Sequence, residues 1–252
     1  MKIGAQFYTL RDHCGTLEDF SETLRRVADI GYTEVQISGV CAYTPQWLDE
    51  ELKKNGLRCV LTHTDPNRIS REPLAVCEDH KVFGCSYIGV GCMPGGVNDE
   101  TYAAFVRDFL PAAKALREQG CTLFYHNHHW EFGNSENGQR FLDRLLTDFP
   151  ADLLSVTLDT YWAQFGGADP AAVIERLKGR GECIHLKDMI IAENEQRMTA
   201  VGDGNLNFDR ILAAAEAVGT EHLLVEQDHC YGKDPFEELA RSYRYLKSLG
   251  LN

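Results

Sequence analysis

Short β-rich runs alternate with amphipathic stretches along the whole chain, and this alternation constrains the fold more than any other feature of the sequence. Such a pattern is typical of a parallel sheet, in which a helix follows each strand and returns the chain to the same edge. One strand and one helical stretch together occupy roughly 30 residues, as expected for βαβ units. The runs expected to form strands are Ile3–Tyr8, Glu34–Ile37, Arg58–His63, Tyr87–Val90, Thr122–His126, Leu154–Asp159, Cys183–Lys187 and His222–Gln227.

The stretches between these runs carry apolar residues at helical spacing, as Phe20, Leu24 and Val27 do. Eight units in about 250 residues favour a closed barrel over an open doubly wound sheet. No G-x-G-x-x-G segment follows the first strand, so a dinucleotide-binding fold is disfavoured. We therefore expect an α/β fold, a single (β/α)8 TIM barrel that forms one domain over residues 1–252. The clearest helical stretches are Leu17–Ile30, Asp99–Gln119, Gly138–Asp148 and Phe208–Val218.

The balance of charge excludes some classes of partner. With 38 acidic and 25 basic residues, the formal net charge is −13, which disfavours binding to a phosphate backbone. No apolar run approaches the roughly 18 residues that would span a bilayer, and the N-terminus lacks the pattern of a secretory signal. We therefore expect a cytoplasmic protein that binds neither nucleic acid nor membrane, and a homo-oligomer remains possible.

The nine cysteines are an odd number and form no C-x-x-C framework. Cys59, Cys121 and Cys183 lie inside apolar, strand-like runs, where a free thiol behaves as a small buried apolar group. We expect these cysteines to be free thiols with a structural role.

Ionisable side chains end several of the predicted strands, which is where β/α barrels place their active sites. Carboxylates and imidazoles that converge on one barrel mouth are costly to bury without a cation. A mixed set of oxygen and nitrogen ligands suits one divalent ion, Mn²⁺ in the first instance and otherwise Zn²⁺, Co²⁺ or Mg²⁺. The residues at these strand ends are His63, His126, His128, Asp159, His185, Lys187, Asp188, Glu226 and Asp228.

Each of these residues also has a purely structural interpretation. A lone histidine at a strand end is often only a hydrogen-bonding residue, Asp159 could cap the next helix, and Glu226 could pair with Lys187. Asp169 and Pro170 form an ordinary helix start, N-cap and then N1, and carry no predicted chemistry. The metal prediction therefore depends on the coincidence of such residues across several strands.

At these positions the sequence resembles the sugar phosphate isomerase/epimerase family, also called xylose isomerase-like TIM barrels. The likeness covers essentially the whole chain, and part of it points to the inosose dehydratase branch. The segments that carry it are Gln6–Asp12 (QFYTLRD), Tyr125–Phe132 (YHNHHWEF), Leu158–Trp162 (LDTYW), His185–Met189 (HLKDM), Gly202–Gly204 (GDG) and Val225–Asp228 (VEQD).

Many members of the family hold one metal ion with a Glu, Asp, His and Glu set from strands five to eight. The resemblance implies that Asp159, His185 and Glu226 supply the last three ligands. At the first corner this chain has His126, and Glu131 follows five residues later. Two interpretations remain open: Glu131 reaches back to bind the metal while His126 contacts substrate, or His126 binds the metal and Glu131 supports it. We expect the first, because a third carboxylate matches the family set.

The resemblance implies proton transfer next to the carbonyl of a sugar or keto-sugar, through an enediolate that a metal ion stabilises. We predict an isomerase or epimerase of this kind. A metal-dependent lyase or dehydratase acting on an inosose or 3-oxo-glycoside is the alternative, favoured by His126 and by the H-x-K-D segment at His185. A barrel that binds sugar without catalysis is the second alternative.

The predicted site residues fall into three groups. The expected catalytic residues are His126, Lys187 and Glu226, and the expected metal ligands are Glu131, Asp159, His185 and Glu226. The residues expected to bind a small sugar or cyclitol are Tyr8, His63, His128, Trp162 and Asp228. Tyr8 and Trp162 would supply the apolar platform against which sugar rings stack.

Overall fold

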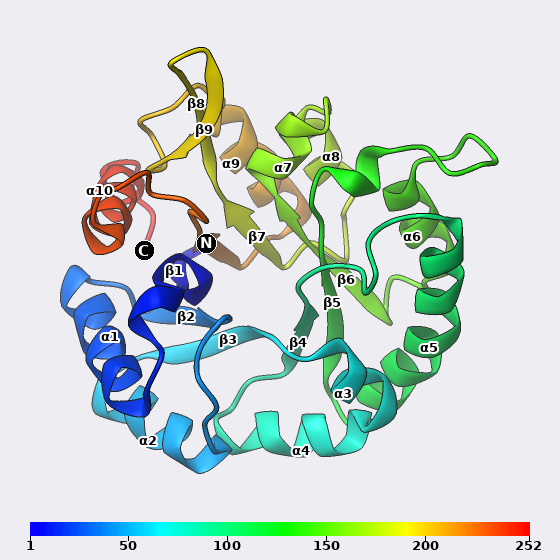
Figure 1. The fold of residues 1–252 in the computed structure, drawn as a ribbon, viewed down its shortest axis with the longest axis horizontal. Coiled ribbons are helices and arrows are strands. Elements are labelled where there is room, and N and C mark those ends of the chain that lie inside the picture. The colour runs from blue at the N-terminus through cyan, green and yellow to red at the C-terminus, as the bar shows by residue number, and fades with distance from the viewer.

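Eight parallel strands close into a barrel in the computed structural model, which describes residues 1–252. The strands are β1 (Lys2–Gln6), β2 (Glu34–Ile37), β3 (Arg58–His63), β4 (Tyr87–Val90), β5 (Thr122–His126), β6 (Leu154–Asp159), β7 (Cys183–Leu186) and β10 (His222–Val225). Each strand pairs with the next in this order, and β10 pairs with β1 to close the barrel. Figure 1 shows the strands at the centre and the helices around them. The predicted TIM barrel is confirmed.

Helices follow each barrel strand and cover the outside of the barrel (Figure 1). None of them is both long enough and apolar enough to cross a membrane. They are η1 (Phe7–His13), α1 (Leu17–Ile30), α2 (Pro45–Lys54), α3 (Pro66–Arg71), α4 (Pro73–Val82), α5 (Asp99–Glu118), η2 (Trp130–Phe132), α6 (Phe141–Asp148), α7 (Thr160–Phe165), α8 (Pro170–Glu175), α9 (Phe208–Val218) and α10 (Pro235–Ser248).

Local sequence determines where these helices begin and end. Thr16 caps α1 by accepting a hydrogen bond from the Asp19 backbone N–H at 3.1 Å. Gly31 ends α1 in the left-handed region, with φ 118°, which glycine adopts at little cost. Asp169 is the N-cap of α8 and Pro170 its first residue, as predicted.

The alternation of side chains along the strands joins the core to the candidate site. Leu61, Phe124, Cys183 and Leu224 form a small buried cluster with Val60. Side chains two residues apart in a strand point to the same face. The residue two positions after each of these four therefore lies on the same side of the sheet, and it is polar in every case. Those polar residues are His63, His126, His185 and Glu226. The same alternation along the strands therefore determines both which side chains pack inside the barrel and which side chains form the site.

Several predicted elements are longer than the observed ones by one to three residues, and two places differ in kind. The first strand ends at Gln6 rather than Tyr8, because the Gln6 side chain accepts a hydrogen bond from the Tyr8 backbone N–H and begins the short helix η1. After β7 the chain forms an unpredicted antiparallel hairpin, β8 (Asp188–Ala192) and β9 (Glu195–Thr199), which projects from the barrel (Figure 1).

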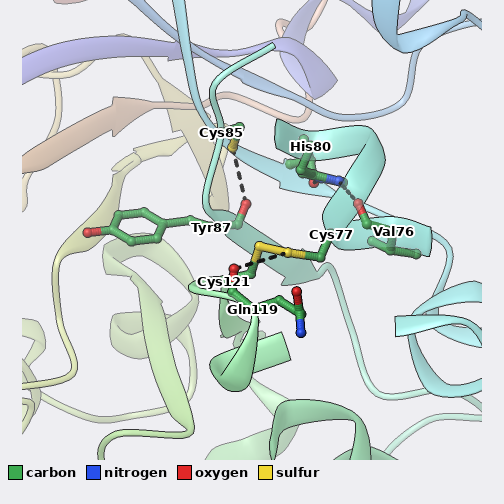
Figure 2. The surroundings of a disulfide bond; sticks show 8 residues. Val76, Cys77, His80, Cys85, Tyr87, Gln119 and Cys121 are labelled. Carbon is green, nitrogen blue, oxygen red and sulfur yellow. Dashed lines mark hydrogen bonds between the residues drawn. A yellow bond between two sulfur atoms is a disulfide. The ribbon is translucent and has the colours of Figure 1, made fainter. Parts of the chain in front are cut away.

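One cysteine prediction is wrong. Cys121, just before β5, forms a disulfide with Cys77 of α4, as Figure 2 shows. The two residues are 44 positions apart in the sequence, and their Cα atoms lie 6.3 Å apart because α4 packs beside the start of β5. The disulfide could not be recognised from the sequence, because Cys121 lies beside an apolar strand and its partner is distant in sequence. Cys59 and Cys183 are buried free thiols, as expected.

Candidate metal centre

Four residues from neighbouring strands bring one ligand atom each to a common point. His126 and Asp159 end β5 and β6, His185 lies in β7, and Glu226 follows β10. The four ligand atoms all lie within 4.8 Å of one another, and all four residues are buried. Parallel strands that end at one edge of a barrel place such residues together although they are distant in sequence.

Both imidazoles of the cluster are anchored on their outer side by an oxygen. The Gly91 carbonyl lies 2.9 Å from Nδ1 of His126, and Oε1 of Gln36 lies 2.6 Å from Nε2 of His185. Because these oxygens accept, each outer nitrogen carries the proton, and the inner nitrogens are the ones that can bind an ion. Anchoring of this kind fixes the tautomer of metal-binding histidines.

The two carboxylates are anchored in the same way. Oδ1 of Asp159 accepts a hydrogen bond from the Trp162 backbone N–H at 2.8 Å and so caps α7. Oε1 of Glu226 accepts one from Nε2 of Gln6 at 2.7 Å. Asp159 therefore does both things that the sequence left open, capping a helix with one oxygen and presenting the other to the cluster.

The inner atoms show that a cation fits this cluster. Nδ1 of His185 lies 2.9 Å from Oε2 of Glu226 and has no hydrogen-bond partner, whereas Oε2 forms an ion pair with Lys187, whose Nζ lies 2.9 Å away. Burial lowers the pKa of His185, so its ring is neutral and its single proton points away, toward Gln36. A bare nitrogen lone pair then faces a carboxylate oxygen. Lys187 offsets the charge of Oε2, but the buried Nδ1 of His185 has no partner, and a cation beside both atoms would satisfy it.

His126 has a different proton state from His185. Burial works against protonation, but the hydrogen bond to Asp159, with His126 Nε2 3.4 Å from Asp159 Oδ2, and the charges of Glu226 and Asp159 together raise the pKa of His126. An ion bound at Nε2 would replace that proton, and metal binding at such sites releases protons.

The structure does not bring Glu131 into the cluster, and the expectation that it binds the metal needs correction. The side chain is buried, but its oxygens accept hydrogen bonds from the Tyr125 hydroxyl at 2.5 Å and from the His128 backbone N–H at 2.8 Å. Glu131 lies in the short helix η2, so its carboxylate fixes the segment after β5. His126 occupies the corner that we expected Glu131 to fill.

Lys187 forms three ion pairs beside the cluster. Its Nζ lies 2.9 Å from Asp159 Oδ2, from Glu226 Oε2 and from Asp228 Oδ1, and the side chain is completely buried. Burial favours the neutral amine, but attraction by Asp159 and the other two carboxylates raises the pKa of Lys187 well above its usual value. Lys187 is thus a buried ammonium, and it does not line the cavity described next.

A cavity of about 560 Å³ opens above the cluster at the C-terminal end of the barrel. All five residues expected to bind substrate line it: Tyr8, His63, His128, Trp162 and Asp228. Glu226 and His126 also reach its surface. A cavity of this size suits a small molecule.

His63 presents an unpartnered nitrogen in this cavity region. Its Nδ1 lies 3.1 Å from the Ser38 hydroxyl, whereas its Nε2 is buried without a hydrogen-bond partner. Burial and the neighbouring His126 lower the pKa of His63 well below its usual value, so the ring is neutral. A buried polar atom without a partner is costly, and a ligand polar group would satisfy it.

Aromatic side chains form one wall of the cavity. Trp130 stacks on His128 with 4.9 Å between ring centroids, and the His128 and Trp162 centroids are 5.4 Å apart. Trp130 is 46% exposed, so its ring is open to a ligand at the mouth. The sequence analysis did not single out Trp130, although it lies within the YHNHHWEF segment.

Asp188 is a strand-end residue with a structural role. Its two carboxylate oxygens accept hydrogen bonds from four backbone N–H groups, including those of Gly202 and Gly204. Asp188 therefore anchors the GDG loop to the base of the β8–β9 hairpin. Its oxygens are consumed by these contacts and do not reach the cluster.

Gln6 and Gln36 are functional residues that the sequence analysis missed. Each is fully buried and holds one cluster residue. Gln6 lies in the QFYTLRD segment that carries the resemblance but had no predicted role, and Gln36 is an uncharged polar residue in the strand EVQI, which does not separate a ligand anchor from an ordinary buried amide.

Comparison with known proteins shows which family the chain belongs to. The model of the family described as "Xylose isomerase-like TIM barrel" matches residues 24–249. An inosose dehydratase of Geobacillus kaustophilus is 24% identical over 267 aligned positions, which cover 90% of this chain and 83% of that protein. An inosose dehydratase of Bacillus cereus is 26% identical over 152 positions, which cover 53% of this chain. The chain thus spans about half of that relative's length, 50%.

Solved structures agree on the fold. A sugar phosphate isomerase/epimerase from Parabacteroides distasonis superposes with a TM-score of 0.84 at 24% identity, covering 98% of this chain and 93% of that one. At this identity the likeness shows the fold alone. The family model, in contrast, matches most of the chain, and its relatives named here are enzymes. The chain belongs to the xylose isomerase-like TIM barrel family.

Proposed function

We propose that this protein is a divalent-metal-dependent isomerase or epimerase that moves a proton at the carbon next to the carbonyl of a small sugar or keto-sugar. The single observation that carries the proposal is the convergence of His126, Asp159, His185 and Glu226, each anchored on its outer side, below a cavity lined by polar and aromatic side chains. Family membership and the inosose dehydratase relative support the same class of chemistry.

These four residues would hold the ion, with two nitrogen and two oxygen donors. Mn²⁺ is our first choice, and Zn²⁺, Co²⁺ or Mg²⁺ are compatible with such donors. When bound, the ion supplies electrostatic stabilisation for the negative charge that develops on substrate oxygens during proton removal.

The side chains of the cavity would bind and orient the substrate. Tyr8 and Trp162 offer ring faces to the apolar side of a sugar or cyclitol. Asp228 and His128 also line the cavity and can bond to hydroxyl groups. His128 and Trp162 each have one ring nitrogen that is buried without a partner, and a polyhydroxylated substrate would supply the missing partners.

Two groups at the cavity surface are suited to proton transfer. Burial favours the protonated form of Glu226, one of the predicted catalytic residues, but Lys187 and the neighbouring imidazoles of His185 and His126 together outweigh it and lower the pKa of Glu226, which stays a carboxylate. The neutral His63 presents Nε2 without a partner. We assign proton removal from carbon to the Glu226 carboxylate and proton exchange with a substrate hydroxyl to His63 Nε2.

The other predicted catalytic residues take different roles in this proposal. His126 serves as a ligand instead of a base. Lys187 is buried behind Asp228 and acts through the carboxylates that it pairs with.

A dehydratase or other lyase is the second candidate, acting on an inosose or a 3-oxo-glycoside. The observation that favours it is the likeness to an inosose dehydratase over 90% of this chain. Proton removal next to the carbonyl would be common to both candidates, and they would differ in whether a β-substituent then leaves.

One experiment tests the proposal and separates the candidates. Protein loaded with Mn²⁺ is incubated in D₂O with a panel of ketoses, inososes and 3-oxo-glucosides, and products are identified by NMR and mass spectrometry. We expect deuterium at the carbon next to the carbonyl in a rearranged sugar. Deuterium in a dehydrated or cleaved product would favour the lyase. The absence of exchange with every compound would contradict both and leave a binding barrel.

A further inference from the structure

The ammonium of Lys187 occupies part of the space in which the cluster would hold its ion. Lys187 Nζ lies 2.9 Å from Asp159 Oδ2 and 2.9 Å from Glu226 Oε2. These two oxygens are the inner ones, because the outer oxygens are bound to the Trp162 backbone N–H and to Gln6. Lysine and metal ion therefore share both anionic ligands.

The third contact of Lys187 is of a different kind. Asp228 Oδ1 also lies 2.9 Å from Nζ, but Asp228 contributes no atom to the four-residue cluster. On the remaining side, the Trp162 ring lies 5.6 Å from Nζ and offers only a weak cation–π contact. Asp228 is thus the one carboxylate that can hold the ammonium without also binding the ion.

Charge arithmetic links the two cations. Asp159, Glu226 and Asp228 carry three negative charges, and Lys187 neutralises one of them, which leaves −2. A divalent ion that also displaces the proton from His126 Nε2 brings this sum to zero. Buried charge is costly unless it is neutralised locally, so the three carboxylates call for both cations. Two cations on the same two oxygens nevertheless repel each other.

We propose that Lys187 and Asp228 form a built-in counter-ion pair that sets the metal affinity of the site. Without the ion, the ammonium lies on the inner oxygens of Asp159 and Glu226 and keeps the carboxylates together. When the ion binds, the ammonium draws back onto Asp228. The affinity for the metal ion is then a balance of two effects. Lys187 repels the ion, and Asp228 reduces this repulsion by attracting the ammonium of Lys187. This inference rests on the metal site proposed above.

The two partners have opposite effects on binding, which makes the proposal testable. Lys187→Met removes the competing cation, so Mn²⁺ should bind at least about tenfold more tightly. Asp228→Asn keeps the side-chain shape but removes the charge that holds the ammonium aside, so Mn²⁺ should bind at least about tenfold more weakly. Both Kd values are measured by isothermal titration calorimetry on full-length protein stripped with a chelator, with Mn²⁺ alone as the ligand.

Matched controls come from a neighbouring part of the mouth. Lys233 pairs with Glu238, and Asp12 lies near it at the surface of a second pocket, so neither contacts the cluster. Lys233→Met and Asp12→Asn change the net charge by the same amounts as the test variants. Their Kd values should stay within about twofold of the wild type, since exposed charges are screened.

Each outcome bears on the proposal. Unchanged or weaker binding by Lys187→Met overturns it, as does unchanged or tighter binding by Asp228→Asn. If Lys187→Met fails to fold without the ion, the Asp228→Asn affinity decides the question. Wild-type protein that binds no Mn²⁺ overturns the metal site together with this inference, whereas wild-type binding with unaffected variants overturns this inference alone.

Discussion

His126 and Glu131 lie in one short segment, but they differ in which side-chain atoms are already engaged in hydrogen bonds with the protein. Both Glu131 oxygens accept hydrogen bonds from the protein, from Tyr125 and from the His128 backbone. The outer nitrogen of His126 is bound to a carbonyl, and its inner nitrogen makes only a long hydrogen bond, 3.4 Å, to another member of the cluster, Asp159. At the scale of single residues, a side chain can bind an ion only if its ligand atom is not already held by the protein outside the cluster. Residue type alone does not determine this.

This difference predicts separate effects of two substitutions on metal content. His126→Ala removes one of four ligand atoms, so the purified protein should fall from about one ion per chain to less than about a tenth. Glu131→Gln keeps an accepting oxygen for the Tyr125 hydroxyl and should retain the ion. Elemental analysis after dialysis measures both. A loss of metal in Glu131→Gln with retention in His126→Ala would restore the carboxylate as the fourth ligand.

Much of the candidate site could be predicted from sequence because its candidate ligands interrupt apolar runs. Asp159, His185 and Glu226 stand at the ends of strands where packing alone would favour apolar side chains, and the cluster contains all three. The anchors left weaker signals. Gln36 looks like any buried amide, and the Gly91 carbonyl is a backbone atom that no residue type reveals.

At the scale of elements, the β8–β9 hairpin and the GDG loop depend on the single carboxylate of Asp188. Gly204 lies so close to it that an added Cβ would overlap Oδ1 of Asp188 and the backbone oxygen of Met189. The hairpin was not predicted because its turn, at Glu193 and Asn194, lacks the Asn-Gly or Asp-Gly pair typical of two-residue turns. The long amphipathic helices were predictable, since their apolar stripes are continuous.

Gly204→Ala should therefore destabilise the protein by about 1–3 kcal/mol, because the new methyl group must push the Asp188 carboxylate or the backbone aside. Gly15→Ala is the matched control, since no atom lies within 4 Å of the Cβ that it would add. We expect its effect to stay within about 0.5 kcal/mol. Urea unfolding followed by circular dichroism gives both values, and equal effects would show that the overlap is relieved without cost.

The contact between α4 and β3 should make stability depend on pH. His80 of α4 lies 2.8 Å from the Thr62 hydroxyl and 2.7 Å from the Val76 carbonyl, as Figure 2 shows for Val76. Burial lowers the pKa of His80 from 6.5 to about 4. The unfolded chain therefore binds more protons than the native protein below pH 6.5. Stability from this group is complete above pH 6.5 and is lost as the pH falls toward 4.

The expected loss between pH 7 and pH 4 is about 3 kcal/mol from His80 alone. His80→Gln removes the titrating group but keeps a polar side chain. The difference in unfolding free energy between wild type and His80→Gln, measured by urea unfolding across this range, should shrink by that amount as the pH falls. A difference that stays constant with pH would show that His80 does not titrate as described.

At the scale of the whole molecule, the Cys77–Cys121 disulfide ties the outer helix layer to the barrel. The fold itself was predictable, because eight alternating units leave few other arrangements. The disulfide was not, because spacing within the sequence does not reveal which cysteines meet in space. A link between residues 44 positions apart restricts the unfolded chain and stabilises the folded one.

Thiol counting tests this link. In the denatured wild type without reductant, seven of the nine cysteines should react with a thiol reagent, and all nine after reduction. Cys77→Ala frees Cys121, so the same number of thiols should react with and without reductant. Reduction should also lower the unfolding free energy of the wild type by about 2–4 kcal/mol and leave that of Cys77→Ala unchanged. Nine reactive thiols before reduction would rule the bond out.

The anchors of the cluster have a consequence for how the barrel could be divided. All four candidate ligands lie in the part of the chain after α5, whereas Gln6, Gln36 and Gly91, which hold three of them in place, lie in the part before it. Neither part contains a complete centre. If the chain were severed between β4 and α5, the piece with every ligand would lack the groups that orient them. Fragment complementation would then complete the centre, because the first piece supplies the groups that orient the ligands of the second.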